Sequence, residues 1–463
     1  MTSPSVPPGP ASPVPARTPH RAILGAAVPL LLSMSVSVVA QLVGTVALGR
    51  RETAALAAFA LASAVLSPVT AAVAAGLRGL APFVAPHRDD PARALPVLRD
   101  ARWLSLAFGT AGAGVVLCVP PLARAAGAPG EVVDGLGALP PLLALEVLLF
   151  AAGGGANTVL VALGRSRQVL WSSLSGTAVQ VGLILLLTPG LGVDGIGLAL
   201  VASTAVSVTV SNICLLRVPG LAGPAARPSR WRSPAWSLWP VRPRPREIAR
   251  MARVGVPMST ALIVKFAVLG GATYVAARTG AQGAAAHAVL RSLAELLALA
   301  AFSVGQATAP EITRAASPGS CPAGSSAEVR RVGRAALSLA GAGAACGALV
   351  LLCSGSAVTG LFTTDAEVAS LVADLLPPMV VYAVANGCGI VMSACLVGLK
   401  RPSWGLLAAV AGYGLLALAA LPATAAWGLT GLWTAMAVGA VLIFALQLTG
   451  FVRHSARTPL AVG

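Results

Sequence analysis

Residues 427–452 read WGLTGLWTAMAVGAVLIFALQLTGFV and contain no charged side chain. About 20 apolar residues of helix cross a hydrocarbon core roughly 30 Å thick, so this stretch predicts a membrane span. Eleven further apolar runs of similar length precede it. Lipid offers the backbone no hydrogen-bond partners, so the runs are expected to be helices and not strands. The predicted spans are 23–48, 54–77, 103–123, 137–162, 168–190, 193–216, 254–277, 284–309, 333–355, 368–397, 403–423 and 427–452.

The spans form two sets of six, separated by an arginine-rich stretch. An even number of spans per set gives both sets the same orientation, so the fold class is an all-α membrane protein. Its twelve transmembrane helices form two six-helix bundles related by a pseudo-two-fold axis along the membrane normal. The predicted organisation is a disordered cytoplasmic tail at 1–20, an N-terminal bundle at 21–216, a cytoplasmic Arg/Pro/Trp-rich linker at 217–250, a C-terminal bundle at 251–455 and a cytoplasmic tail at 456–463.

The charged residues make up only 10% of the chain, yet the formal net charge is +17. With the N-terminus placed in the cytoplasm, the inward loops and tails hold 26 of the 32 Lys and Arg residues, and the outward loops hold four. This asymmetry follows the positive-inside rule, so a multi-pass cell-membrane protein with both termini cytoplasmic is expected. A nucleic-acid partner is not expected, because aromatic residues are only 4% and the charge does not gather on one soluble face.

The two halves also repeat in sequence. Pro29 near the start of the first span corresponds to Pro257 near the start of the seventh. Gly164 is matched with Gly398, each ahead of basic residues in an inward loop. The turn 192–195 (GVDG) corresponds to 428–431 (GLTG) at a shift of 236 residues. Two related bundles leave a cleft near the midplane, where secondary transporters place their substrate.

Several of these motifs, in their order and spacing, resemble the multidrug and toxic compound extrusion (MATE) family of bacterial transporters. They are 254–257 (VGVP), 283–287 (GAAAH), 305–307 (GQA), 360–365 (GLFTTD), 395–398 (CLVG), 428–433 (GLTGLW), 162–167 (ALGRSR) and 191–195 (LGVDG). The resemblance covers about residues 20–455. It implies a V-shaped pair of six-helix bundles that exports small, often cationic, amphiphilic compounds in exchange for inward H⁺ or Na⁺.

The chain departs from the family at the carboxylates that the resemblance assigns to cation coupling. The first span reads Val43-Gly44-Thr45, where relatives carry an acid in the middle position. In the fifth span, Gln180 and Ile184 stand where one branch carries Asn and Asp. The family's Glu in the seventh span falls on Lys265, and its Asp in the tenth span falls on Asn386. The resemblance therefore carries over the fold and not the usual coupling chemistry.

Helical rise places four polar residues of the C-terminal half at one depth. Lys265 lies about 10 Å below the outer surface, Arg291 and Glu295 lie about 11–17 Å deep, and Asn386 is level with them. His287 precedes Arg291 by four residues and lies nearer the surface.

A charge at mid-membrane is costly and marks a functional site by default. One reading is a structural salt bridge; the other is a site for anionic or carboxylate-bearing substrates, or a Glu295 that titrates. Lipid-facing, snorkelling side chains are a third reading. Lys265 itself is a candidate titrating group, and His287 a weaker candidate proton relay.

In the N-terminal half, Glu146 is the only acidic residue deep in a span. Its position about 15 Å from either side suits proton coupling, above all if Gln41 or Gln180 faces it. The alternative is a protonated carboxyl group that only joins helices within the bundle.

The sequence lacks the residue motifs that would indicate an enzyme. Neither lysine follows a glycine, so no phosphate-binding loop exists and ATP is not an expected partner. Metal-ligand spacings and nucleophile motifs are absent from the sequence, so no metal site, cofactor or enzymatic activity is expected.

The expected partners are a small organic substrate, the lipid bilayer and H⁺ or Na⁺, and the chain is expected to act as a monomer. The leading hypothesis is a MATE-like antiporter for drugs or secondary metabolites, working by proton-coupled alternating access. The alternatives are a flippase for a lipid-linked or amphipathic anionic substrate and a major-facilitator-type exporter.

Overall fold

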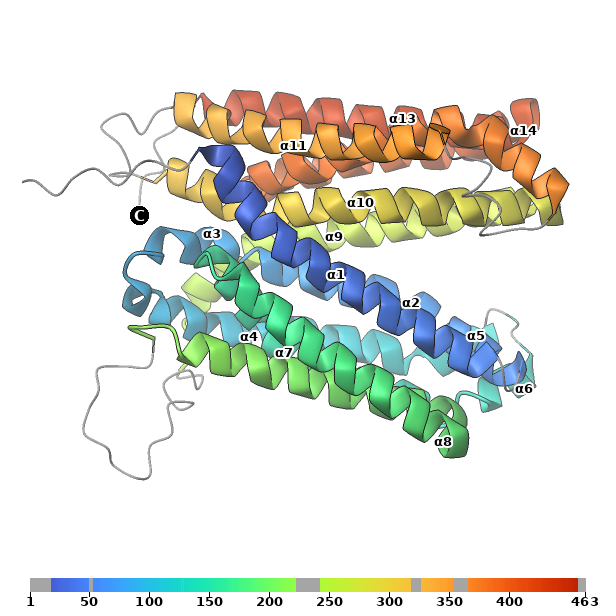
Figure 1. The fold of residues 1–463 in the computed structure, drawn as a ribbon, viewed down its shortest axis with the longest axis horizontal. Coiled ribbons are helices and arrows are strands. Elements are labelled where there is room, and N and C mark those ends of the chain that lie inside the picture. Colours follow the sequence, from blue (N-terminus) through green and yellow to red (C-terminus); the bar gives the residue numbers. More distant parts are fainter. Residues whose placement is uncertain are drawn as a thin grey trace, which may run out of the picture.

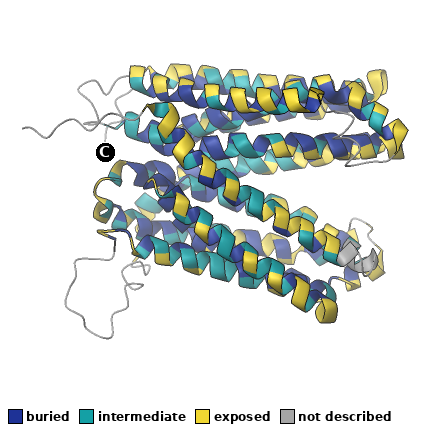
Figure 2. Cartoon of the chain, viewed as in Figure 1, coloured by how far each residue is buried: buried dark blue, intermediate teal, exposed yellow. Residues whose placement is uncertain are grey.

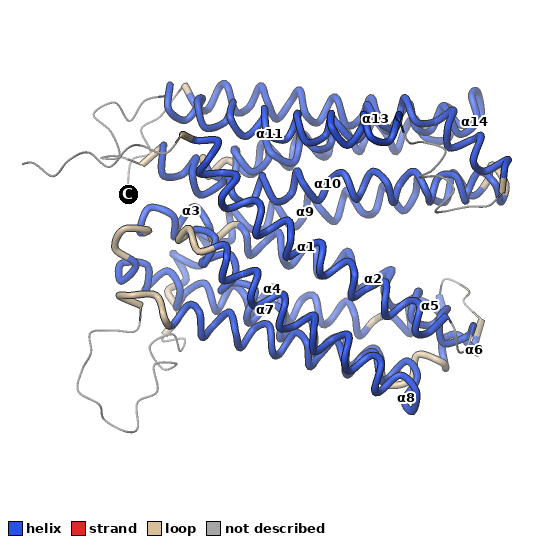
Figure 3. Tube along the Cα trace, viewed as in Figure 1, coloured by secondary structure: helices blue, strands red, loops and turns tan. Residues whose placement is uncertain are grey.

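The computed structural model describes residues 18–49, 53–125, 127, 129–221, 242–317, 326–353 and 365–456. Most of the predicted tails and of the 217–250 linker lie outside these residues. Every regular element in the described ranges is a helix (Figure 3). The helices are α1 (Pro19–Gly49), α2 (Thr53–Arg78), α3 (Ala81–Val84), η1 (Ala85–His87), η2 (Pro91–Ala94), α4 (Leu95–Leu117), α5 (Val119–Ala125), α6 (Gly130–Asp134), α7 (Leu139–Ala162), α8 (Ser166–Leu216), α9 (Pro245–Ala277), α10 (Ala281–Ala315), α11 (Ser326–Cys353), α13 (Ala366–Gly398) and α14 (Pro402–Ser455).

Two of the helices, α8 and α14, are hairpins that each supply two spans. They contain 51 and 54 residues, and each is broken by a glycine with a left-handed backbone: Gly192 at φ 56° and Gly428 at φ 58°. Only glycine adopts this conformation without a steric cost from Cβ. The eight other long helices, α1, α2, α4, α7, α9, α10, α11 and α13, supply one span each. The predicted fold class of twelve transmembrane helices in two bundles is therefore confirmed.

The third span is bent rather than straight. α4 and α5 meet at an angle of 42° next to Cys118, within the predicted span 103–123. Pro120 and Pro121 follow at once and lack the backbone N–H that would continue the helix, so the bend has a local cause.

The two bundles are closest at the end of the molecule that carries both described termini, and they diverge toward the other end (Figure 1). We call the first of these the basic end, because most of the loop arginines lie there. α1 crosses between the bundles in this view. Its first turns, with Ile23 and Ala27, pack in an apolar cluster with α10, α11 and α13, whereas Leu30 packs with helices of the N-terminal half. α1 thus belongs to both halves, although the predicted N-terminal bundle begins at residue 21.

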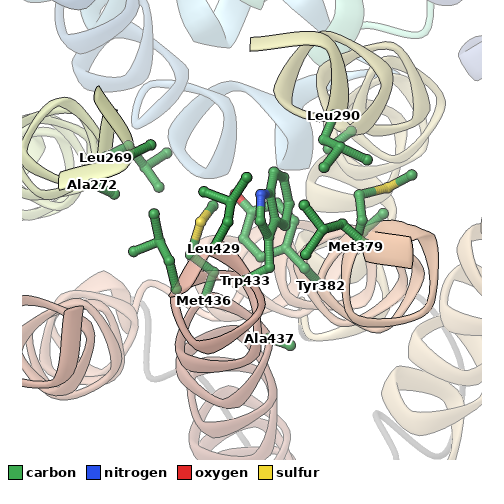
Figure 4. Close-up of a cluster of buried hydrophobic side chains, with 14 of the residues drawn as sticks. Leu269, Ala272, Leu290, Met379, Tyr382, Leu429, Trp433, Met436 and Ala437 are labelled. Carbon is green, nitrogen blue, oxygen red and sulfur yellow. The ribbon is translucent and has the colours of Figure 1, made fainter. Parts of the chain in front are cut away.

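The interior of each bundle is apolar, and so is much of its outer surface. In the C-terminal half the indole of Trp433 is fully buried among Leu269, Leu290 and Met379 (Figure 4). Exposed positions run along the outside of both bundles (Figure 2) and include Leu186 and Leu418, which are 71% and 80% exposed. Large exposed apolar side chains are stable on a surface that faces lipid.

Backbone angles correct one part of the predicted repeat. Leu163 and Leu399 end α7 and α13 with the same angles, φ −82° and ψ 3°. The next residues, Gly164 and Lys400, are both left-handed, at φ 75° and 57°. The partner of Gly164 is therefore Lys400 and not Gly398, which brings this pair to the same shift of 236 residues as Gly192 and Gly428.

Candidate functional site

A cavity of about 170 Å³ lies between the two halves, next to the basic end. α2, α3 and α7 contribute its N-terminal wall, and α9, α10, α13 and α14 contribute the opposite wall. The N-terminal wall is lined by Ala75, Arg78, Ala81, Thr158 and Val161, and the C-terminal wall includes Pro257, Lys265, Phe302, Gln306, Asn386 and Gln447. Pockets between bundled helices are usual ligand sites, so this cavity is the candidate binding site.

Two predicted site residues, Lys265 and Asn386, line this cavity. Lys265 projects from the middle of α9, and its Nζ lies 5.9 Å from the centroid of the Phe302 ring. No carboxylate of the described residues lies within salt-bridge distance of Lys265; its cationic contact is the face of an aromatic ring.

Arg78 is a second cation in the cavity that the sequence did not single out. Its guanidinium carbon lies 5.9 Å from the same Phe302 centroid, so Arg78 and Lys265 flank one ring from opposite halves of the molecule. Arg78 is the last residue of α2. An arginine at a span end is expected to reach the headgroups, and only the packing of α2 against α9 turns it into the cavity.

Arg291 and Glu295 do not line the cavity. They form an ion pair along α10, with Arg291 Nε 3.2 Å from Glu295 Oε1. Arg291 also donates from Nη1 to Thr273 Oγ1 at 3.0 Å, and Thr273 Oγ1 lies 3.4 Å from Nε2 of His287. Both charges lie near enough to Lys265 to act on it electrostatically. The predicted cluster therefore divides into three parts: Lys265 and Asn386 at the cavity, the Arg291–Glu295 pair on α10 with an exposed Glu295 side chain, and His287 buried in the C-terminal bundle.

His287 is buried inside that bundle. Its ring lies 5.5 Å from the indole of Trp433, and its Nδ1 has no hydrogen-bond partner among the described residues. The His287 ring therefore packs against an aromatic side chain. It is also the last member of a series of side-chain contacts that runs from Glu295 through Arg291 and Thr273.

Glu146 is buried between α7 and the second arm of α8. Thr204 Oγ1 donates to Glu146 Oε1 at 3.1 Å, and Oε2 is buried without a partner among the described residues. Gln41 is exposed on α1 and Gln180 is half-buried on α8, and neither forms a hydrogen bond with the carboxyl group. The structure therefore does not bring the three residues together.

In the N-terminal half, the two positions where the resemblance implies carboxylates, Gly44 and Ile184, lie in an apolar environment. A Cβ on Gly44 would lie 3.5 Å from Cδ1 of Ile184, and Ile184 is 1% exposed within the N-terminal core. The two positions are neighbours, so one apolar contact stands where the resemblance implied paired acids.

Beside the cavity, the two halves touch through a set of contacts that we call the basic-end contact. Arg88 Nη1 lies 2.9 Å from Glu311 Oε1, and Nζ of Lys400 lies 4.8 Å from the centroid of the Phe83 ring. Burial lowers the pKa of Lys400, and nearby Arg250 acts in the same direction. Each interaction joins a residue of the α2–α4 connection to a residue of the C-terminal half.

Helix backbones also meet at the basic-end contact. Ser259 Oγ donates to the carbonyl oxygen of Ala72 at 2.7 Å. A Cβ on Gly255 would lie 2.6 Å from the carbonyl oxygen of Gly76, and a Cβ on Gly79 would lie 2.9 Å from Cα of Gly255. α2 and α9 therefore approach as closely as their backbones allow, which requires glycine at these positions.

Known proteins similar to this chain are transporters. The MatE family model matches residues 257–421. Among curated relatives, a probable multidrug resistance protein NorM of Xanthomonas campestris pv. campestris is 25% identical over 366 residues, which is 74% of each chain. The multidrug resistance protein NorM of Burkholderia vietnamiensis is 27% identical over 334 residues, 67% of this chain and 69% of its own.

Solved structures share the fold over nearly the whole chain. An outward-facing multidrug resistance MATE family transporter of the MOP superfamily superposes with a TM-score of 0.81 at 20% identity, covering 95% of this chain and 97% of that one. A MOP superfamily transporter from Pyrococcus furiosus Vc1 gives 0.76 at 19% identity, covering 94% and 95%. The chain therefore shares the two-bundle, twelve-span fold of MATE transporters, and its sequence is similar to that family over residues 257–421.

Proposed function

We propose that this chain exports small organic compounds across the cell membrane by alternating access, in exchange for protons. The observation that carries the proposal is the position of the cavity. It lies between the two halves, and its lining residues Ala75, Arg78 and Pro257 are within one helical turn of the glycines where α2 and α9 touch. Separation of the halves at this contact would open the cavity to the basic end without unfolding either bundle.

The positive-inside rule supports a cytoplasmic location for the basic end. In that orientation the described arrangement is closed toward the cytoplasm, as expected of an outward-facing state. The names of the curated relatives, multidrug resistance proteins, support drugs or related small organic molecules as cargo.

Glu146 is the residue that we assign to coupling. A carboxylate buried without a cationic partner is costly, so this group is stable when it holds a proton or another cation. The family's usual carboxylates are replaced by Gly44, Ile184, Lys265 and Asn386, so a proton must bind elsewhere for export to remain coupled.

The test is transport by the full chain in proteoliposomes with a panel of neutral, cationic and anionic fluorescent compounds. A pH gradient imposed across the proteoliposome membrane should drive uphill movement of at least one compound. A protonophore should stop this movement. A sodium gradient that drives the same movement would identify Na⁺ as the coupling ion. Failure of every compound to move under either gradient would refute the proposed function.

The Arg88–Glu311 ion pair should favour the state that is closed at the basic end. The pair is half-buried, and a charge-assisted hydrogen bond contributes about 1.5–3 kcal/mol. Arg88→Glu should therefore shift the population toward separated halves by about tenfold or more, because two carboxylates then face each other. Spin labels at Asp89 and Arg401, exposed positions in the two halves, report the distance across the contact.

The charge-swapped double variant, Arg88→Glu with Glu311→Arg, is the matched control. It should restore most of the short-distance population, because it regenerates an ion pair in the same place. Equal distance distributions in the wild type and in Arg88→Glu would show that the pair does not hold the halves together.

A further inference from the structure

We infer that the cavity binds the charged group of an amphiphilic organic anion, a carboxylate, sulfonate or phosphate, between Arg78 and Lys265. This inference rests on the proposed function, since it names the substrate class of the proposed exporter. Its starting point is the pair of cations that flank Phe302 from opposite halves of the molecule.

The charge of the cavity is uncompensated. Arg78 and Lys265 line it, and no aspartate or glutamate is among its described lining residues. Neither cation forms a salt bridge with another described residue, and Glu295, which acts on Lys265 electrostatically, is already paired with Arg291. Two unpaired cations in a low-dielectric site attract an anion strongly, because water screens them poorly there.

The geometry suits one shared anionic group. Each cation lies 5.9 Å from the same ring centroid, so the two charges are separated by no more than twice that distance. A carboxylate or sulfonate that lies beside the ring is attracted by both charges. The amides of Gln306, Asn386 and Gln447 also line the cavity and supply further N–H donors.

The remaining lining of the cavity is largely apolar, so it favours an anion with an organic body over an inorganic ion. Its wall includes Met258, Ile390, Leu406 and Ile443, and its volume of about 170 Å³ has room for on the order of ten water molecules. An apolar group of this size gains free energy by leaving water, which a small inorganic anion does not. Because Arg78 belongs to α2 and Lys265 to α9, the bound anion would also hold the two halves together beside the basic-end contact.

The test uses three probes with one aromatic body: 2-naphthoate, 2-naphthylmethylammonium and 2-naphthalenemethanol. Their binding to the full chain in nanodiscs of neutral phosphatidylcholine is measured by equilibrium dialysis, with empty nanodiscs subtracted. The naphthoate should bind at least about tenfold more tightly than the ammonium compound, with the alcohol between them. Arg78→Gln and Lys265→Gln should each weaken naphthoate binding by about tenfold or more.

Lys265→Glu should reverse the order of the two charged probes. A reversed preference is a gain of binding, so a folding failure cannot mimic it. Arg102→Gln is the matched control: Arg102 is a partly buried arginine of α4 that bonds to Asn212 away from this cavity, and its removal should leave all three affinities unchanged.

Other results would overturn the inference. These are equal or tighter binding of the ammonium compound to the wild type, and naphthoate binding that neither Arg78→Gln nor Lys265→Gln weakens. Nanodiscs that contain phosphatidylglycerol separate the two sources of an anion. Displacement of naphthoate by this lipid from the wild-type protein would assign the site to a lipid headgroup and refute a soluble substrate. If the wild type exports a cationic dye without binding naphthoate, the inferred anionic substrate class is wrong, whereas the proposed export function is retained.

Discussion

Gly255→Val is expected to reduce export by at least about fivefold, whereas Gly270→Val on the same helix leaves it unchanged. A Cβ on Gly255 would lie 2.6 Å from the backbone carbonyl oxygen of Gly76, an atom that cannot rotate away. Overpacking of this kind costs about 1–3 kcal/mol, which shifts the equilibrium roughly 5- to 150-fold toward separated helices. An exporter that cannot close at the basic end cannot complete its cycle.

The control follows from the same helix. A Cβ on Gly270 meets nothing within 4 Å, so valine there changes the local propensity without forcing α2 and α9 apart. Efflux rates in proteoliposomes and spin-label distances between Asp89 and Arg401 are measured for both variants. A folded Gly255→Val protein with wild-type transport and unchanged distances would show that the closure of α2 on α9 is not part of the cycle.

Glu146→Gln is expected to remove the response of transport to a pH gradient, with a fall of about 100-fold in gradient-driven uphill export. Glutamine has the size of the protonated carboxyl group and can still accept from Thr204, but it cannot release a proton. Substrate binding and downhill exchange should survive, because Glu146 does not line the cavity. The measurement is export under an imposed pH gradient, beside counterflow exchange without a gradient.

Glu131→Gln makes the same chemical change at an exposed acid of α6 and should leave the pH dependence intact. If the Glu146→Gln variant still follows the pH gradient, Glu146 only joins α7 to α8 and coupling resides elsewhere. Export that follows a sodium gradient in the wild type and is lost in Glu146→Gln would instead make this carboxylate a Na⁺ site.

The membrane-spanning architecture could be predicted because its signals are local. Each span has about the length and hydropathy that a bilayer demands, and both hairpin breaks coincide with the turns predicted at 192–195 and 428–431. The repeat itself was predicted with one wrong pair. Lys400, a non-glycine residue in a left-handed conformation, gives no sequence signal that it corresponds to Gly164.

The grouping of the polar residues could be predicted only in part. Depth along a helix is readable from residue spacing, and Lys265 and Asn386, which it places at one level, both line the cavity. Depth does not say which way a helix faces. Arg291 and Glu295 therefore share the level of Lys265 but pair along α10, outside the cavity.

The sequence by itself determined the class of the protein, the number of spans and the division into two halves, because these depend on composition and spacing. The absence of the usual coupling carboxylates is what its resemblance to the MATE family implies. Only the tertiary structure decided that Arg78 meets Phe302 opposite Lys265, that Gly44 lies beside Ile184, and that Glu146 is apart from Gln41 and Gln180. These relations depend on how α2 packs against α9 and α1 against α8. Such contacts join residues far apart in the chain through helix rotation and close approach, which the hydropathy of each helix does not specify.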